Sequence, residues 1–123
     1  MILVDSSVWI SHFRYGNTAL PELLDAALVL VHPFVISELA CGSLKNRRQI
    51  LAYLTAVPFA VEASNDEALR LIDAHKLWGQ GLGWIDVHLI ASALLSKCRL
   101  YTLDQNLEKI AEHAGISTYR ASR

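Results

Sequence analysis

The chain has 123 residues, of which 53% are hydrophobic, a mean hydropathy of +0.30 and a formal net charge of −1. This length predicts one domain over residues 1–123, with enough core to fold without disulfide bonds. No apolar run approaches membrane-spanning length and no leader pattern is visible, so we expect a cytoplasmic protein without a membrane partner. A near-neutral charge gives no basic signature for nucleic acid, although a local basic patch remains compatible with it.

The chain opens with ILV, followed by an acid and two serines. Residues 2–5 are predicted to form a buried strand that ends on Asp5. Ser6 or Ser7 is expected to cap a helix that runs through Phe13. A second helix is expected over residues 18–27.

The middle of the chain begins with LVLVH, residues 28–32, a β-branched run typical of a strand covered on both faces. Pro33 suits the first position of a helix that continues over residues 34–42. Residues 45–56 form a further predicted helix with a basic head, and residues 59–63 a short strand.

Ser64 and Glu67 have the spacing of a capping box, which predicts a helix from there to about Trp78. Residues 79–83, GQGLG, are expected to break the chain. The strongly apolar segment 85–97 follows as a helix.

RLYTLD, residues 99–104, repeats the opening pattern of a strand that ends on an acid. A helix over residues 105–115 and a last strand over residues 116–119 complete the chain. Alternating strands and helices predict an α/β fold of three layers, α/β/α, around a mostly parallel sheet of four to five strands.

Four acids are predicted to meet at one edge of this sheet. Asp5 and Asp104 follow strands, and ligands of such sheets bind outside the carboxyl ends of the strands. Glu38 and Asp86 lie in apolar helices that begin at the same edge. Each acid also has a purely structural interpretation: Asp5 and Asp104 can cap helices, and Asp86 can stabilise a helix dipole. Glu38 is the hardest to explain in this way.

A cluster of carboxylates is unfavourable alone, because two of them about 4 Å apart repel by about 4 kcal/mol at an effective dielectric near 20. Cations relieve this repulsion, and oxygen ligands without His or Cys favour Mg²⁺ or Mn²⁺. Such a site suits phosphodiester hydrolysis by metal-activated water.

Four segments together resemble the PIN-domain ribonucleases, and among them the VapC toxins of toxin–antitoxin pairs. The four, in order, are ILVDSSVWI, VISELACG, GWIDVHLIASALL and LYTLDQNLEKIA. The resemblance covers essentially the whole chain and implies a PIN-like, Rossmann-like fold.

The resemblance also implies the roles of individual residues. Asp5, Glu38, Asp86 and Asp104 would be the catalytic acids, with Asp5 and Asp86 as the principal Mg²⁺ ligands and Mn²⁺ as a substitute. Polar positions beside the acids are Ser6 and Thr102, which would orient carboxylates or water, and Asn106, whose role stays open.

The implied function is a Mg²⁺-dependent endoribonuclease that leaves a 5′-phosphate and a 3′-hydroxyl. The implied partners are an RNA substrate, a VapB-like antitoxin protein and a second copy of the chain in a homodimer. One alternative is a catalytically degenerate PIN module that binds RNA or a protein without cutting. Another is a metal-dependent hydrolase of a different phosphorylated substrate, such as a DNA nuclease or a phosphatase.

Several other residues have two interpretations. Basic side chains that can assist RNA binding are Arg14, Lys45, Arg47 and Arg48. The stretch KNRR, residues 45–48, can equally be a solvated helix head. The five histidines show no zinc-site spacing and are expected to be superficial or partly buried. Trp84 is expected to pack in the core or in a dimer interface, with base stacking as the alternative.

Overall fold

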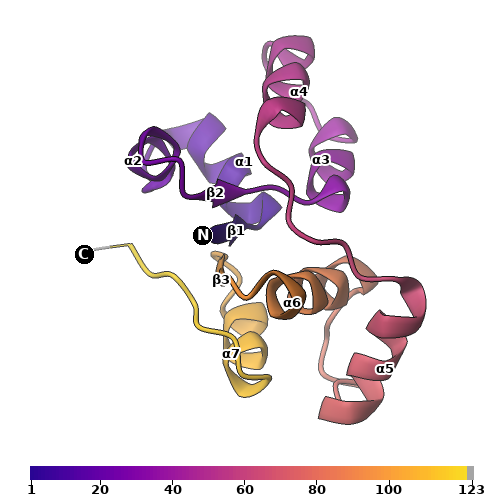
Figure 1. The fold of residues 1–123 in the computed structure, drawn as a ribbon. Helices are drawn as coiled ribbons and strands as arrows, with labels where there is room; N and C mark the ends of the chain where they lie inside the picture. Colours follow the sequence, from indigo (N-terminus) through magenta and orange to yellow (C-terminus); the bar gives the residue numbers. More distant parts are fainter. Residues whose placement is uncertain (122–123) are drawn as a thin grey trace.

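The computed structural model describes residues 1–121, which form a short parallel sheet between two layers of helices (Figure 1). The strands are β1 (Ile2–Val4), β2 (Val29–Leu30) and β3 (Arg99–Tyr101), in the order β2-β1-β3. The register pairs Leu3 with Leu30 on one side and with Leu100 on the other. The predicted three-layer α/β architecture is therefore confirmed.

The predicted number of four to five strands is wrong, because the sheet of residues 1–121 has three. The two other predicted strands, 59–63 and 116–119, each contribute one isolated parallel bridge, Val31 with Phe59 and Leu100 with Thr118. Each bridge is held by two backbone hydrogen bonds at the edge of the sheet. Pro58 lacks an N–H group, so the first of these segments cannot extend its ladder in that direction.

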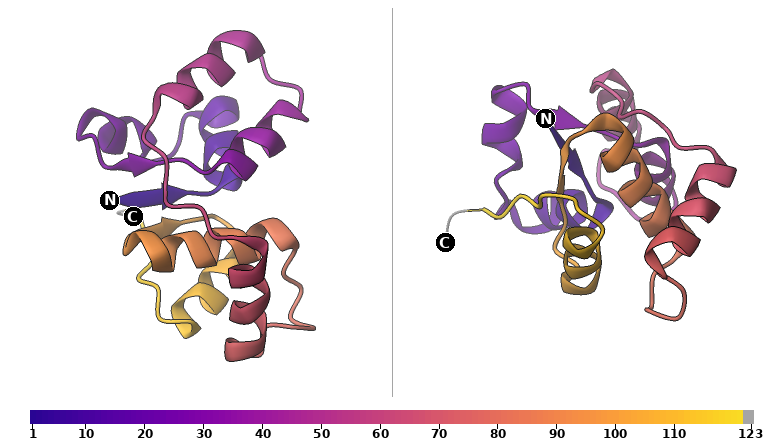
Figure 2. Two further views of the ribbon diagram at one scale, coloured as in Figure 1. Left: turned by 45° about the vertical axis from the view of Figure 1, so that its right-hand side comes forward. Right: turned by 60° about the horizontal axis from the view of Figure 1, so that its bottom comes forward.

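Seven helices lie in the described part of the chain. Their bounds are α1 (Ser6–Tyr15), α2 (Leu20–Asp25), α3 (Pro33–Ala40), α4 (Arg47–Ala56), α5 (Asn65–His75), α6 (Trp84–Ser96) and α7 (Gln105–His113). Figures 1 and 2 show α1 to α4 in the half of the molecule that contains β2, and α5 to α7 in the half that contains β3. The chain crosses from one half to the other between α4 and α5, and β2 and β3 lie on either side of the central β1.

Local chemistry sets where these helices begin. Asp5 rather than Ser6 or Ser7 caps α1, since its carboxylate accepts a hydrogen bond from the Ser6 backbone N–H. Pro33 occupies the first turn of α3 as predicted. The capping box of Ser64 and Glu67 is present at the start of α5.

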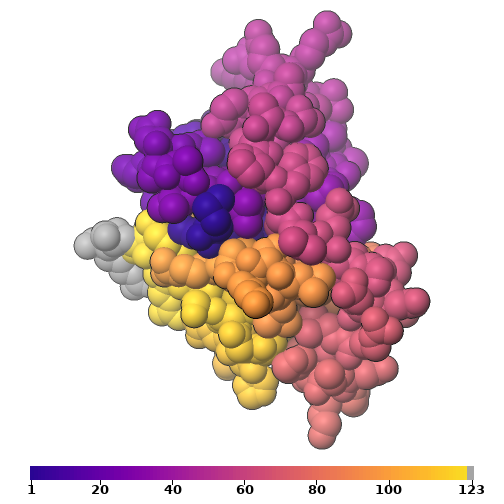
Figure 3. All heavy atoms as spheres, in the orientation of Figure 1, coloured from indigo at the N-terminus to yellow at the C-terminus, as the bar shows by residue number. Residues whose placement is uncertain are grey.

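The core lies on both faces of the sheet. Fully buried apolar side chains from all three strands meet those of the helices, among them Leu3, Trp9, Leu39, Leu89 and Leu100. Figure 3 shows only a small area of the indigo N-terminal segment between the helices on this face of the molecule. The burial of β1 fixes Asp5 at the point where the core ends.

Candidate active site

Asp5 forms the floor of the site at the carboxyl end of β1, where only 6% of the residue is exposed. Its Oδ1 accepts from the Ser6 backbone N–H at 2.8 Å. Its Oδ2 accepts from the hydroxyls of Ser7 at 2.7 Å and Thr102 at 2.8 Å. Three short bonds satisfy the buried carboxylate, and Oδ1, with one short bond, keeps lone-pair capacity for a further partner.

Thr102 connects Asp5 to the acid that follows β3. Its hydroxyl donates to Asp5 and accepts from the Asp104 backbone N–H at 3.0 Å. Ser7 strengthens the connection, because its hydroxyl accepts from the Leu103 N–H at 3.0 Å. These bonds fix the loop after β3 against the end of β1.

Glu38 reaches the site from α3. Its Oε1 accepts a hydrogen bond from the Ser6 hydroxyl at 3.1 Å. Ser6 thus lies between two acids, since its backbone N–H binds Asp5 and its side chain binds Glu38. Residue 38 is largely exposed, which places its carboxylate at the rim of the site.

The two remaining acids lie at helix starts. The Asp86 Oδ2 accepts from the Gly83 N–H at 3.0 Å in the first turn of α6, and the residue is half-buried. The Asp104 Oδ1 accepts from the N–H groups of Asn106 at 2.9 Å and Leu107 at 3.2 Å, which caps the exposed start of α7. The structural interpretations of Asp5 and Asp104 as capping residues are therefore correct, and Asp86 lies in the first turn of its helix as its dipole interpretation requires, whereas Glu38 has no such role.

The charges of the four acids act on one another. Partial burial of its carboxyl group raises the pKa of Glu38, and the Ser6 hydrogen bond lowers it, while the negative charges of Asp5 and Asp86 raise it further. Burial also raises the pKa of Asp86, the Gly83 N–H lowers it, and the charges of Asp5 and Asp104 raise it. The four carboxylates predicted from the sequence therefore form one electrostatic cluster.

The donor chemistry of this cluster fits a hard divalent cation. Its groups are carboxylate and hydroxyl oxygens, and the mutual repulsion of the carboxylates is what a cation relieves. Within residues 1–121 no three acidic, His or Cys side chains already converge as a finished metal site. Glu38 and Asp104 are exposed, whereas Asp5 is buried and Asp86 is half-buried.

The prediction that all five histidines are superficial or partly buried is wrong for two of them. His32 and His88 are buried, with 1% and 2% exposure. His32 caps α3 through Nδ1, which accepts from the Phe34 N–H at 2.9 Å. The His88 ring packs edge-on against Phe34 and Trp84. This aromatic cluster joins α3 and α6, the helices that carry Glu38 and Asp86.

The structural roles of Ser7 and Asn106 were not predicted from the sequence. Ser7 binds Asp5 and the loop after β3, a contact between residues too far apart in the chain for spacing to reveal it. Asn106 donates from Nδ2 to the Gln80 carbonyl at 3.0 Å. It connects α7 to the glycine-rich loop before α6, so its amide acts as a tether in this structure.

None of the helices within residues 1–121 is both long and apolar enough to cross a bilayer.

The chain resembles known proteins in sequence and in fold. The family model of the PIN domain matches residues 2–113. The chain is 42% identical over 118 residues to Ribonuclease VapC32 of Mycobacterium tuberculosis, with 95% of each protein covered. That protein matches equally in two strains of the organism.

Solved structures show the same fold at low sequence identity. FitAcB from Neisseria gonorrhoeae matches with a TM-score of 0.67 at 15% identity, covering 98% of this chain and 97% of that one. FitAB bound to an IR36 DNA fragment matches with 0.69 at 17% identity, covering 97% and 94%. PAE2754 from Pyrobaculum aerophilum matches with 0.60 at 17% identity, covering 89% and 78%. The chain belongs to the PIN-domain family and, within it, to the VapC-type proteins.

Proposed function

We propose that this protein is a Mg²⁺-dependent endoribonuclease and the toxin of a toxin–antitoxin pair. The observation that carries the proposal is the electrostatic cluster of Asp5, Glu38, Asp86 and Asp104 at the carboxyl edge of the sheet. The name of the VapC32 relative, a ribonuclease at 42% identity, supports RNA as the substrate.

Asp5 and Asp86 are the proposed principal metal ligands, with Glu38 and Asp104 completing the pocket. A bound divalent cation would supply the Lewis acid that activates water and stabilises the leaving oxygen in phosphodiester hydrolysis. Ser7 and Thr102 hold the Asp5 carboxylate in place by donating to Oδ2, so that its position does not depend on the ion. Burial of Asp5 keeps competing water away from this carboxylate.

Glu38 and Asp86 have a second task in this proposal. Their raised pKa values favour protonation in the absence of a cation, and a cation shifts both toward the ionised form. Cleavage should therefore decline as pH falls through the acidic range, where protons compete with the metal for the same oxygens.

The proposed binding partners are inferred from the same family membership and from the VapC name of the relative. We propose a small antitoxin protein that inhibits the toxin, and a homodimer of this chain. The cytoplasm, where RNA substrates are found, is the proposed place of action.

The test is cleavage of RNA by the chain purified without any antitoxin. Three proteins, the wild type, Asp5→Asn and Asp73→Asn, are each incubated with total tRNA and ribosomal RNA. Each incubation is done once with Mg²⁺ and once with EDTA. Asp73 lies on the exposed surface of α5, so its substitution is the same chemical change away from the site. Discrete fragments are expected that need Mg²⁺ and are lost only in Asp5→Asn.

The alternative of a binding-only PIN module makes the opposite prediction. It gives no metal-dependent fragments, and Mn²⁺ titrated into the same samples shows no site-specific binding. Equal cleavage by Asp5→Asn and wild type in metal-limited buffer would remove Asp5 from the proposed machinery.

A further inference from the structure

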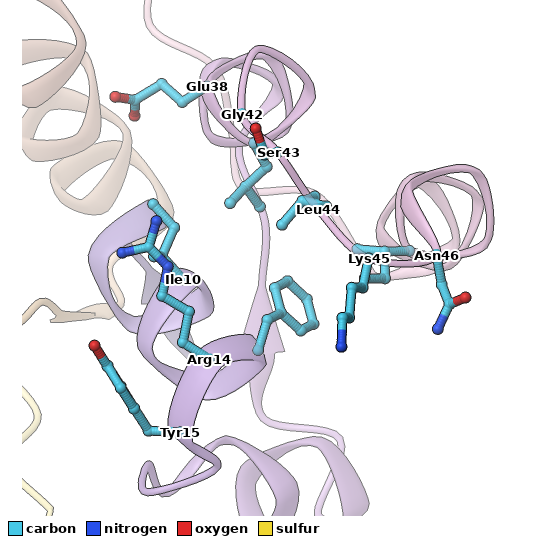
Figure 4. A pocket seen from close by; sticks show the side chains of 12 residues that line it. Ile10, Arg14, Tyr15, Glu38, Gly42, Ser43, Leu44, Lys45 and Asn46 are labelled. Atoms are coloured by element: carbon cyan, nitrogen blue, oxygen red, sulfur yellow. The ribbon is translucent and has the colours of Figure 1, made fainter.

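A large cavity adjoins the acid cluster on the side of α1. It has a volume of about 650 Å³, within the range of about 300–1,000 Å³ for small-ligand sites. One wall is α1 and the other is α3 with the connection to α4 (Figure 4). Its floor is apolar and is formed by Ile10, Phe13, Leu39, Leu44 and Ile50.

Two cations stand on the facing walls of this cavity. Arg14 extends from α1 and Lys45 from the connection between α3 and α4 (Figure 4). Both residues are exposed, and within residues 1–121 neither has a carboxylate partner at ion-pair distance. Arg47, by contrast, is engaged, because its guanidinium donates twice to the Ala40 carbonyl. Arg14 and Lys45 are therefore available to an anionic ligand.

The rim also carries groups that suit a nucleobase. Tyr15 is 73% exposed at the end of α1, where Figure 4 shows it at the opposite end of the lining from Lys45 and Asn46. Asn46 precedes α4 but makes no capping hydrogen bond, and its φ of 54° is a left-handed conformation that Asn tolerates. Its amide is thus left to donate to and accept from a ligand, such as the edge of a base.

Glu38 belongs both to the acid cluster and to the lining of the cavity. A chain that enters the cavity therefore passes directly to the proposed cleavage point. The acids repel phosphates, so an RNA that approaches them needs cations close by, and Arg14 and Lys45 meet that need.

From these contacts we propose that the cavity is a subsite for a single-stranded, unstacked nucleotide next to the cleaved phosphodiester bond. The base lies on the apolar floor and Asn46 reads its edge. Tyr15, at the opposite end of the cavity, offers its ring to a neighbouring base, and Arg14 and Lys45 contact flanking phosphates. Aromatic stacking combined with a positively charged groove is the usual way in which proteins hold single strands. This inference rests on the proposed RNA substrate and adds where and how that substrate is held.

The test measures binding without cleavage. All variants are made in the Asp5→Asn background and titrated in EDTA with a fluorescent single-stranded RNA of about a dozen nucleotides and random sequence, near the ~4–16 nucleotides of a single-strand site. Fluorescence anisotropy gives the affinity at several salt concentrations, and circular dichroism confirms that each variant is folded.

The charge variant is Arg14→Gln with Lys45→Gln, and its matched control is Arg70→Gln with Lys109→Gln on α5 and α7. Losing two phosphate contacts should lower the slope of log affinity against log salt by about 1.4, because each contact to a single strand contributes about 0.7. The control pair should leave the slope at the parent value. Equal slopes in the two pairs would overturn the proposal.

The base-contact variants are Tyr15→Ala and Asn46→Gly. Tyr15→Ala should weaken binding about fivefold or more, and its control, Tyr53→Ala on the exposed face of α4, should not. Gly adopts the backbone conformation of Asn46 without strain, so Asn46→Gly removes only the amide, and it should reduce the preference among homopolymer competitors.

Other outcomes separate this proposal from neighbouring ones. If the cavity variants bind RNA like the parent but no longer form a complex with an antitoxin protein, the cavity is a binding site for that protein. This result would overturn the proposal. The binding assay needs neither metal nor catalysis. Its result therefore does not depend on whether the protein cleaves RNA. Metal-dependent cleavage by the wild type, together with unaltered RNA binding by the cavity variants, would overturn this inference alone.

Discussion

Thr102→Val tests the hydrogen-bond network beneath the acid cluster. The side chains have nearly the same shape, and residue 102 is 4% exposed, so the change removes a hydroxyl and leaves little cavity. Two bonds are lost: the one donated to the Asp5 carboxylate at 2.8 Å and the one accepted from the Asp104 N–H at 3.0 Å.

The expected cost follows from these two bonds. A bond to a charged group contributes about 1.5–3 kcal/mol and a neutral one about 0.5–1.5 kcal/mol. The exposed Asp104 N–H can turn to water, so the free energy of unfolding should fall by about 2–3 kcal/mol. Thr102→Ser keeps the hydroxyl and should recover most of this loss.

Urea denaturation provides the assay, with Thr55→Val as the control. The Thr55 hydroxyl donates to the Ala52 carbonyl at 2.7 Å on the exposed side of α4, so this matched change should cost less than about 0.5 kcal/mol. The midpoint should fall for Thr102→Val at an unchanged m-value. An equal, small effect of both variants would refute the view that Thr102 anchors the site.

Three further predictions concern the surroundings of the acids. Asp86→Asn should raise the free energy of unfolding in EDTA by about 0.5 kcal/mol at pH 7, because it removes a charge that partial burial and its neighbours disfavour and that solvent screens in part. Since the pKa of Asp86 is raised, the wild-type carboxyl becomes protonated as pH falls, and the stability difference between the two proteins should disappear. A variant that is still more stable than the wild type at low pH would contradict the explanation. Burial, aided by His88, lowers the pKa of His32 to about 4. The unfolded chain therefore binds the extra proton between about pH 6.5 and pH 4, and stability should fall by about 3 kcal/mol as pH decreases through that window. His32→Asn keeps a cap acceptor and should flatten this part of the pH profile; an identical slope would show that His32 is not its source. Asn106→Ala should speed hydrogen exchange of the amides in loop 79–83, because the bond to the Gln80 carbonyl is lost. Unchanged exchange would show that this bond does not restrain the loop.

The grouping of the four acids was predictable from the sequence because the rules of parallel sheets determine it, while their catalytic and metal-binding roles stay predictions. Apolar runs that end on Asp5 and Asp104 require both acids to lie at one edge, next to the helices that carry Glu38 and Asp86. Each acid predicted as a capping residue does cap a helix, so the structural and functional interpretations of these residues are compatible.

The details that depend on contacts between distant segments were not predictable. Strand length at the edges depends on tertiary pairing, and segments 59–63 and 116–119 gain only one bridge each. The burial of His32 and His88 follows from aromatic packing between α3 and α6, which no spacing in the chain encodes. The cavity beside Glu38 likewise exists only once α1 and the α3–α4 connection face each other.

The central claim, that the four acids hold a divalent cation for RNA cleavage, is tested most directly by an anomalous difference map from crystals soaked in Mn²⁺. The account predicts a peak in direct contact with Asp5 and Asp86, and no peak there in crystals of Asp5→Asn. An empty acid cluster at an Mn²⁺ concentration that supports cleavage in solution would contradict it.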